Sequence, residues 1–559
     1  MSKEQGSESA VSRSQSIKED EVSKEKEAPK KVSRREFVKG AAAGAGALAG
    51  AGALASCAPA ATPAPTTAPE PTAATVAAAA ATPVPENEQT YDVLVVGWMG
   101  LSGLIATLRA AEQGANVIAI DTQPSDSIWL GGNMNISGHG VGRAGVSLMA
   151  SPDELRAAIA AKTEGNYLPD VVEADVNTAN RAIEWLIGKG ADIVDDGMRI
   201  GNRVPNNSWY ACKPGGPNDF RDYGGYKLAR DLEAHIKAQE NVEIAYETRA
   251  VKLLEDAKGR VCGVLAEGKD GRFEIKAKAV ILTTGGFERN REMLVRYCGP
   301  HADELGVYSS PYSGAGDGHL MALDIGAAMR SMTYSGYLGV WPEASARKED
   351  LWKVGIDSLQ EGIVVTKTGE RIADEGLGYR VYGSIMLKSL SVTGYFIIDQ
   401  TIYEGTKVEA ALADTIEYGG TVYTADTIPE LAAEAGINPY VATTVNEFNE
   451  AIDDGKIEEI RIPKSAQVNK ILTPPYYAVP FRIGTVGTYG GLLVTPTGNV
   501  SRADGTVIPG LYAGGLVMEG SLSGGGAENK AGAYVNCLAT CIIWGTISAE
   551  NAAAYAKTL

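Results

Sequence analysis

The stretch Tyr91–Gln123 constrains the fold of this chain more than any other part of the sequence. Near its two ends, residues 93–96 and 116–120 form short, mostly apolar runs rich in β-branched side chains, which predict two buried parallel strands. A helical apolar pattern lies between them, and three glycines precede it, Gly97, Gly100 and Gly103. An acidic residue, Asp121, directly follows the second run.

Strand, glycine turn, helix, strand and acid in this order predict a dinucleotide-binding unit. The turn lets the backbone approach a pyrophosphate, the helix N-terminus offers free N–H groups, and the acid accepts a hydrogen bond from a ribose hydroxyl. The turn has one residue more than the usual G-x-G-x-x-G spacing, with Met99 near the second glycine. An ordinary strand–turn–helix is the alternative, but every part here stands in the expected order.

Residues 1–57 predict an export segment rather than part of a fold. The first 32 are mainly Ser, Lys and Glu with little to bury, so we expect them to be disordered. Ser33–Lys39, SRREFVK, matches a twin-arginine signal, and the Ala/Gly run 40–56 is shorter than the roughly 20 residues of a membrane span. The alternative is a chance basic pair before a transmembrane helix.

The end of this segment, Leu54–Cys57, resembles a bacterial lipobox, in which Cys57 would carry the lipid. Cleavage after a small residue without lipidation is the alternative. Residues 58–90 are rich in Ala, Pro and Thr and predict a flexible tether. We therefore expect a protein exported by the twin-arginine route and lipid-anchored at the outer face of the cytoplasmic membrane or in the periplasm.

The formal net charge of −18 argues against nucleic acid and against direct binding to anionic lipid. The five cysteines beyond Cys57 are scattered, without a C-x-x-C-H motif or a zinc spacing, although Cys537 and Cys541 lie one helical turn apart. The sequence thus predicts no metal and no covalent haem. Electrons must then come from a separate protein, such as a quinol dehydrogenase, a cytochrome or a small flavoprotein, or from a diffusible donor.

Three further glycine motifs follow the first unit. A loop with Gly131, Gly132 and Asn133 suits a pyrophosphate or a ribityl chain, although an ordinary polar loop is an equal alternative. The apolar run 273–282 leads into Thr-Thr-Gly-Gly at 283–286, and Gly-Ala-Gly-Asp-Gly-His at 314–319 opens a helix.

With Pro475–Ala478, Gly490–Leu492 and Ile508–Gly515, these motifs resemble the flavoprotein subunits of fumarate reductases and succinate dehydrogenases, in particular the soluble flavocytochrome c and urocanate reductase-like branch. The resemblance runs from about Tyr91 to Ala556. It implies an α/β fold, with a Rossmann-like FAD-binding domain of the GR2 type and an inserted α+β cap domain. The implied bounds are 91–325 and 484–559 for the FAD-binding domain and 326–483 for the cap.

The resemblance also implies the cofactor contacts. Carried over by motif, FAD would be held by Gly97, Gly100, Gly103, Asp121, Gly131, Gly132, Asn133, Thr284, Gly285, Asp317, Gly515, Ala531 and Gly532. Most relatives have a glutamate after the glycine that corresponds to Gly515, whereas Leu516 stands here. The Gly-Gly-Asn form resembles the branch that binds FAD without a covalent bond.

The substrate positions depart from those of fumarate reductases, which hold the fumarate carboxylates with histidines and arginines and deliver the proton from a cap arginine. By motif, Tyr403 stands in place of that arginine, Trp341 in place of a cap histidine, and Lys530 in place of a second substrate arginine. Glu375 is retained, and Arg380 follows it closely.

Aromatic side chains therefore replace charge, and Trp341, Tyr489 and Tyr534 predict a pocket for a bulkier, less charged enoate or enone. Tyr403 could donate the proton if Arg380 lowered its pKa, and Lys530 could bind a carboxylate or carbonyl. Cap packing for Tyr403, a surface position for Lys530, and a salt bridge of Glu375 instead of a proton relay are the alternatives.

The sequence thus predicts an exported FAD-dependent oxidoreductase that reduces an activated C=C bond by hydride transfer from flavin N5, in the setting of anaerobic respiration. A ketosteroid-type flavin dehydrogenase, which runs in the oxidative direction, is one alternative. A non-catalytic flavin electron carrier is the other.

Overall fold

The structure is a computed structural model that describes residues 90–125, 151–163, 167–191, 193–195, 210–212, 224–307, 314–333, 335–342, 360–377, 379–389, 392–405, 408–417, 420–518 and 537–559. The twin-arginine motif, Cys57 and the Ala/Pro/Thr tract lie outside these ranges, so export and lipid anchoring stay predictions. Among the helices of the described ranges, none combines the length and the apolar character needed to cross a bilayer.

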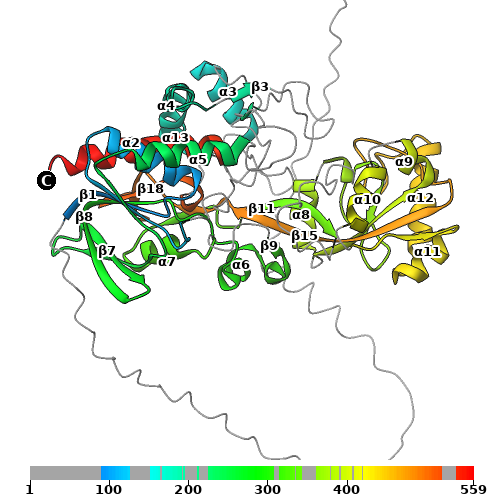
Figure 1. Ribbon diagram of the computed structural model, residues 1–559. Helices are drawn as coiled ribbons and strands as arrows, with labels where there is room; N and C mark the ends of the chain where they lie inside the picture. The colour runs from blue at the N-terminus through cyan, green and yellow to red at the C-terminus, as the bar shows by residue number, and fades with distance from the viewer. Residues whose placement is uncertain are drawn as a thin grey trace, which may run out of the picture. The chain divides into compact units, whose positions relative to one another are not determined.

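The first sheet is built around the predicted βαβ unit (Figure 1). Its strand order is β17-β18-β8-β1-β2-β5, and the five strands after β17 are parallel to one another. Their bounds are β1 Thr90–Val96, β2 Val117–Ile120, β5 Val242–Ala245, β8 Gly271–Leu282, β17 Asn499–Ser501 and β18 Val507–Ala513. Because the four residues of β2 and the last four of β1 are buried, the two apolar runs occupy the centre of the sheet, as predicted.

A β-hairpin extends this sheet at the N-terminal half of β8. Strand β6 (Arg249–Glu255) pairs with β7 (Val261–Gly268), and β7 pairs with β8, both in antiparallel fashion. The C-terminal half of β8 continues into the parallel sheet, so the strand predicted at 273–282 belongs to both arrangements. Residues after β8 are therefore delivered to the carboxyl edge of the parallel strands, where ligands bind in open α/β sheets.

Helices α2 (Leu101–Glu112), α5 (Gly224–Lys237) and α13 (Cys537–Ala556) lie over one face of the sheet, and α4 (Pro169–Gly188) packs on α13 (Figure 1). Helix α13 packs against α2, α4 and β8 and buries Trp544, whose indole N–H donates to Asp175 at 3.0 Å. Helix α3 (Pro152–Thr163) precedes α4 in the chain.

A second sheet has its own apolar core, which includes Phe396, Phe448 and Phe481. Its strand order is β11-β15-β13-β12, and β9 and β14 also pair with β15. The bounds are β9 Gly306–Val307, β11 Ser335–Pro342, β12 Ile363–Val365, β13 Thr393–Asp399, β14 Tyr423–Ala425 and β15 Tyr476–Thr488.

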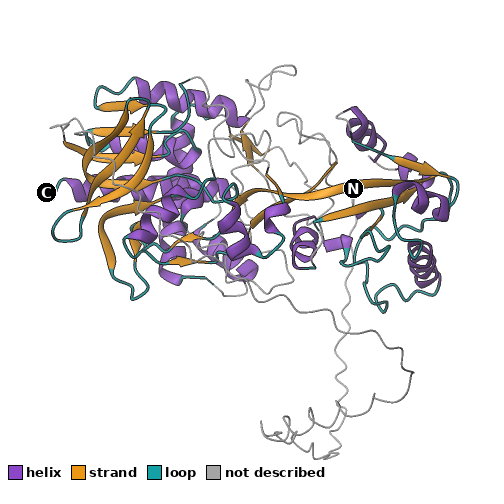
Figure 2. Ribbon diagram, turned by 90° about the horizontal axis from the view of Figure 1, so that it is seen from below, coloured by secondary structure: helices purple, strands orange, loops and turns teal. Residues whose placement is uncertain are grey.

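Within the described residues, five helices accompany this sheet. Figure 2 shows helices in purple beside its orange strands. The five helices are α8 Tyr379–Lys388, α9 Gln400–Gly405, α10 Val408–Glu417, α11 Ile428–Ala435 and α12 Val441–Asp453. The short strands β10 (Met329–Arg330) and β16 (Gly491–Leu492) pair close to the two predicted boundaries of the cap. The α/β fold class, with this mixed second sheet, agrees with the prediction, while the domain bounds at 326 and 483 stay predictions.

Candidate functional site

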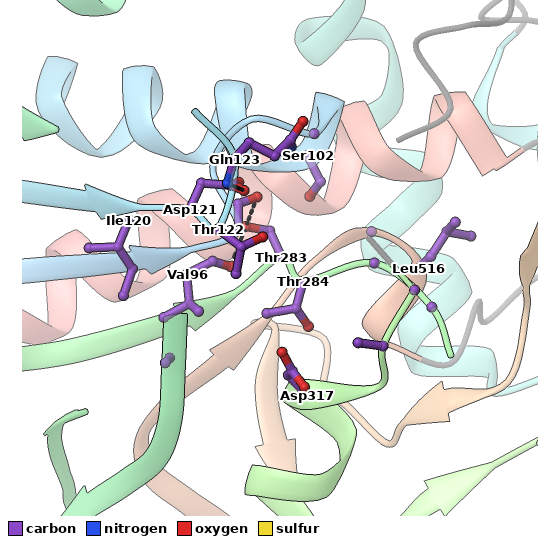
Figure 3. A pocket seen from close by; sticks show the side chains of 18 of the residues that line it. Val96, Ser102, Ile120, Asp121, Thr122, Gln123, Thr283, Thr284, Asp317 and Leu516 are labelled. Atoms are coloured by element: carbon purple, nitrogen blue, oxygen red, sulfur yellow. Dashed lines mark hydrogen bonds between the residues drawn. The ribbon is translucent and has the colours of Figure 1, made fainter. Parts of the chain in front are cut away.

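A cleft with an empty volume of about 990 Å³, partly open to solvent, lies at the carboxyl edge of the parallel strands (Figure 3). Seven of the residues predicted to bind FAD line it together, Gly97, Gly100, Asp121, Thr284, Gly285, Asp317 and Gly515. They come from five separate segments of the sequence, so the fold brings most of the predicted cofactor contacts into one place.

The glycine turn has two tightly packed positions and one open position. Gly97 has a φ of +87°, and a Cβ there would lie 2.8 Å from the carbonyl oxygen of Thr283. A Cβ at Gly103, which packs under the turn, would lie 2.4 Å from the carbonyl oxygen of Gly97. At Gly100 a Cβ would meet nothing within 4 Å, and this residue precedes α2 without a side-chain cap. The open side faces the cleft, where free N–H groups of the helix N-terminus suit a pyrophosphate.

Asp121 directly follows β2 and lines the cleft. Its side chain is buried and accepts hydrogen bonds from the backbone N–H groups of Met99, at 3.0 Å, and Gln123, at 3.2 Å. Burial raises the pKa of this carboxyl group, against the opposing effect of those hydrogen bonds. The hydrogen bond from Met99 connects Asp121 to the glycine turn. The longer turn therefore contributes a backbone N–H group that holds this carboxylate.

Three buried polar atoms in the cleft lack a hydrogen-bond partner among the described residues. They are Oγ of Ser102, Oγ1 of Thr284 and Oε1 of Gln123. Buried polar groups are nearly always hydrogen-bonded, so these atoms indicate a polar ligand. FAD, with its hydroxyl groups and pyrophosphate, fits this cleft through these atoms, Asp121 and the open side of Gly100.

Asp317 opens α7 (Asp317–Asp324), and its carboxylate pairs with the guanidinium of Arg249. Two residues further on, His319 is fully buried with its ring edge-on to Phe287 at 5.5 Å between centroids. Burial lowers the pKa of His319 to about 4, so the imidazole is neutral.

Glu375, in the short helix η7 (Glu375–Leu377) of the cap, belongs to a buried ionic cluster. Its carboxylate accepts two hydrogen bonds from Arg371, at 3.0 and 2.6 Å, and one from the backbone N–H of Val364 at 2.8 Å. Lys464 Nζ lies 3.9 Å from the same carboxylate and donates to the carbonyl oxygens of Gln360 and Gly362. Burial lowers the pKa of Lys464 to about 8. The geometry is that of the predicted salt-bridge alternative; the proton-relay role stays a prediction.

Tyr403 lies in α9, where its ring stacks on Tyr477 with 4.8 Å between centroids and packs against the cap core. Tyr477 is near the start of the 13-residue strand β15, and Thr488 at its other end accepts a hydrogen bond from the backbone N–H of Phe287. An extended strand of this length spans roughly 40 Å. The structure therefore does not bring Tyr403 to the FAD cleft, and its placement favours the packing alternative over proton donation.

The other predicted site residues are placed only in part. Tyr489 follows β15 directly and is half-buried, while Trp341 is known here by its backbone, which pairs with Arg482 across β11 and β15. Arg380 belongs to the first turn of α8, without a described side chain. Five predicted cofactor contacts and two substrate residues lie outside the described residues, Gly131, Gly132, Asn133, Ala531, Gly532, Lys530 and Tyr534.

Sequence reasoning missed several residues of the cleft. Ser102 follows the second glycine of the turn by two positions and could have been found from the motif. Arg249, Glu288 and Cys541 had no such signal, because they reach the cleft from a hairpin strand, a loop and the last helix. Glu288 is buried, with 2% of its surface exposed. A Cβ at Gly286 or Gly314 would collide with its side chain, so the two glycines leave room for it.

The fold and the cleft define a flavin-dinucleotide-binding protein. The family model described as FAD binding domain matches residues 92–533, and the chain belongs to this family. This confirms FAD as the cofactor; noncovalent attachment stays a prediction.

Two relatives and one solved structure show which proteins of this family the chain is similar to. A fumarate reductase (cytochrome) of Shewanella frigidimarina is 27% identical over 494 residues, which cover 86% of this chain and 79% of the relative. A urocanate reductase of Eggerthella lenta is 28% identical over 514 residues, covering 85% and 77%. The open conformation of a flavocytochrome c3 fumarate reductase has a TM-score of 0.66 at 25% identity, covering 84% of this chain and 79% of that one. The chain is an FAD-dependent oxidoreductase of this fumarate reductase-like group, as predicted.

Proposed function

We propose that this flavoenzyme reduces a carbon–carbon double bond next to a carboxylate or carbonyl, in an acceptor bulkier and less charged than fumarate. The observation that carries the proposal is an FAD cleft of the fumarate reductase-like group combined with a substrate region without the expected histidines and arginines. Trp341 and Tyr489 stand there instead, and aromatic side chains favour large apolar ligands. Bound FAD would supply the hydride.

The residues of the chain would position the cofactor and protonate the product. Ser102, Thr284 and Gln123 offer the polar atoms that orient FAD, and Lys530 would bind a carboxylate or carbonyl of the acceptor. Hydride addition to one alkene carbon leaves negative charge on its neighbour, which a positioned acid must quench. Because Tyr403 packs away from the cleft, we assign this step to Arg380, a different arginine of the cap, which lies on the first turn of α8.

The proposal also covers the location of the protein in the cell and its protein partner. The twin-arginine motif and the lipobox at Cys57 support export and a lipid anchor, and residues 58–90 would form the tether. The absence of a haem-attachment motif in the sequence supports a separate electron-donor protein.

The test is anaerobic reoxidation of the reduced full-length protein. Fumarate, urocanate, cinnamates and steroid enones are each added, and the flavin absorbance is followed. We expect rapid reoxidation by an aromatic or polycyclic acceptor and slow reoxidation by fumarate. Fast turnover of fumarate would overturn the substrate class.

Oxidised flavin mixed with the matched saturated compounds tests the opposite direction. Faster reduction by a saturated ketosteroid than reoxidation by its enone would support the dehydrogenase alternative. A flavin indifferent to every acceptor and every donor of this type would support the electron carrier.

A further inference from the structure

A bidentate ion pair crosses the rim of the FAD cleft. Nε of Arg249 lies 2.8 Å from Oδ2 of Asp317, and Nη2 lies 2.6 Å from Oδ1. Arg249 is the first residue of β6 and Asp317 is the first residue of α7, so the pair joins two elements that are far apart in the sequence. Both residues line the cleft, with side-chain exposures of 54% and 23%.

The pair lies at the end of the cleft where the nucleoside half of FAD is expected. The residue before Arg249, Thr248, donates its backbone N–H to the carbonyl oxygen of Asp121 at 2.8 Å. An acid at this position of a dinucleotide-binding unit accepts hydrogen bonds from the adenosine ribose. Arg249 is thereby held beside the ribose-binding acid by the backbone itself.

The half-exposed position of Arg249 limits what this pair contributes to folding. Exposed ion pairs contribute little to folding, because water screens them and ordering two long side chains costs entropy. Strand β6 is already held by its ladder to β7. A bidentate arginine–carboxylate arrangement is nevertheless specific in its geometry, and a ligand that covers it removes the screening water.

The chemistry of the pair matches an adenosine group. The oxygens of Asp317 keep lone pairs beyond the two that Arg249 uses, so the carboxylate can still accept from hydroxyl groups. A guanidinium plane with part of its surface exposed can stack on an aromatic ring. Lysine would keep the charge but would lose both the fork geometry and the stacking surface.

We propose that the Arg249–Asp317 pair is a positioning device for the adenosine half of FAD, and that it sets the preference of this protein for FAD over FMN. Arg249 orients the Asp317 carboxylate toward the cleft and covers the adenosine end. The inference does not depend on which acceptor the enzyme reduces.

The test measures dissociation constants of the flavin-free full-length protein for FAD, FMN and ADP by fluorescence and calorimetry. We expect Arg249→Ala to weaken FAD and ADP at least tenfold and to leave FMN within about twofold. Arg249→Lys should lie between Arg249→Ala and the wild type. In the double variant with Asp317→Asn, the loss for FAD should not exceed that of the more affected single variant, because the two side chains act as one unit.

Arg156→Ala is the matched control, since Arg156 makes a bidentate, partly exposed pair with Glu173 on α3 and α4, outside the cleft. It should leave all three constants unchanged. Unchanged FAD and ADP affinity in Arg249→Ala would overturn the proposal. An equal loss for FMN and FAD, or additive losses in the double variant, would overturn it too, because either result would mean general damage to the cleft or independent action.

Discussion

Both carboxylate oxygens of Glu375 accept hydrogen bonds from Arg371, and both side chains are almost completely buried, at 1% and 4% exposure. Removing one partner of such a pair leaves an uncompensated buried charge, which costs about 3–5 kcal/mol. We therefore expect Glu375→Gln to lower the free energy of unfolding by roughly this amount in urea titrations. Glu370→Gln, at an exposed position of the same loop, should lower it far less.

The same variant separates the two interpretations of Glu375. If Glu375 only holds the cap together, the flavin reoxidation rate per folded molecule should be unchanged. A rate that falls at least a hundredfold with unchanged stability would show a proton relay instead.

Tyr403 gives a second test of the cap. Tyr403→Phe keeps the ring that stacks on Tyr477 and removes only the hydroxyl group. We expect the rate of flavin reoxidation by the best acceptor to stay within about twofold, whereas the loss of a general acid costs typically 10²–10⁴ in rate. Arg380→Ala is the companion variant and should show such a loss. The opposite ranking of the two variants in stopped-flow traces would restore Tyr403 as the proton donor.

His319 makes the free energy of unfolding depend on pH below neutrality. Its folded pKa is about 4, below the unfolded value of 6.5, so between these values the unfolded chain binds a proton that the folded protein does not. Stability from this group is complete above pH 6.5 and is lost as the pH falls toward 4, by about 1.4 kcal/mol per pH unit.

The check compares urea midpoints at pH 7 and pH 5 in two variants. His319→Gln should remove about 2 kcal/mol of the pH-dependent loss over this interval. His301→Gln, at a more exposed histidine paired with Glu304, should keep the loss of the wild type. An identical pH slope in wild type and His319→Gln would contradict the buried, neutral state of the imidazole.

The sequence was informative where local chemistry and global fold agree. The apolar runs, the glycines at 97, 100 and 103 and the acid at 121 predicted the first βαβ unit because turn geometry and burial act on neighbouring residues. The position of Tyr403 could not be predicted in this way. Motif alignment gave it a place in the chain, but the register of β13 on β15, a long-range pairing, decides which end of the cap it occupies. Arg249 was missed for the same reason, since its partner Asp317 is distant in the sequence.

Gly100 and Gly103 test whether the turn is a cradle for the cofactor or only a tight connection. A methyl group at Gly103 would meet the backbone of Gly97 and Trp98 at 2.4 Å, so Gly103→Ala should shift strand against helix and destabilise the protein with or without FAD. A methyl group at Gly100 meets no protein atom within 4 Å, so Gly100→Ala should leave the melting temperature of the flavin-free protein within a few degrees. The same methyl group points into the cleft, where we expect it to raise the dissociation constant for FAD at least tenfold.

Flavin fluorescence titrations and thermal melts of both flavin-free variants would measure the two effects separately. Wild-type FAD affinity in Gly100→Ala would show that the pyrophosphate does not lie against this turn.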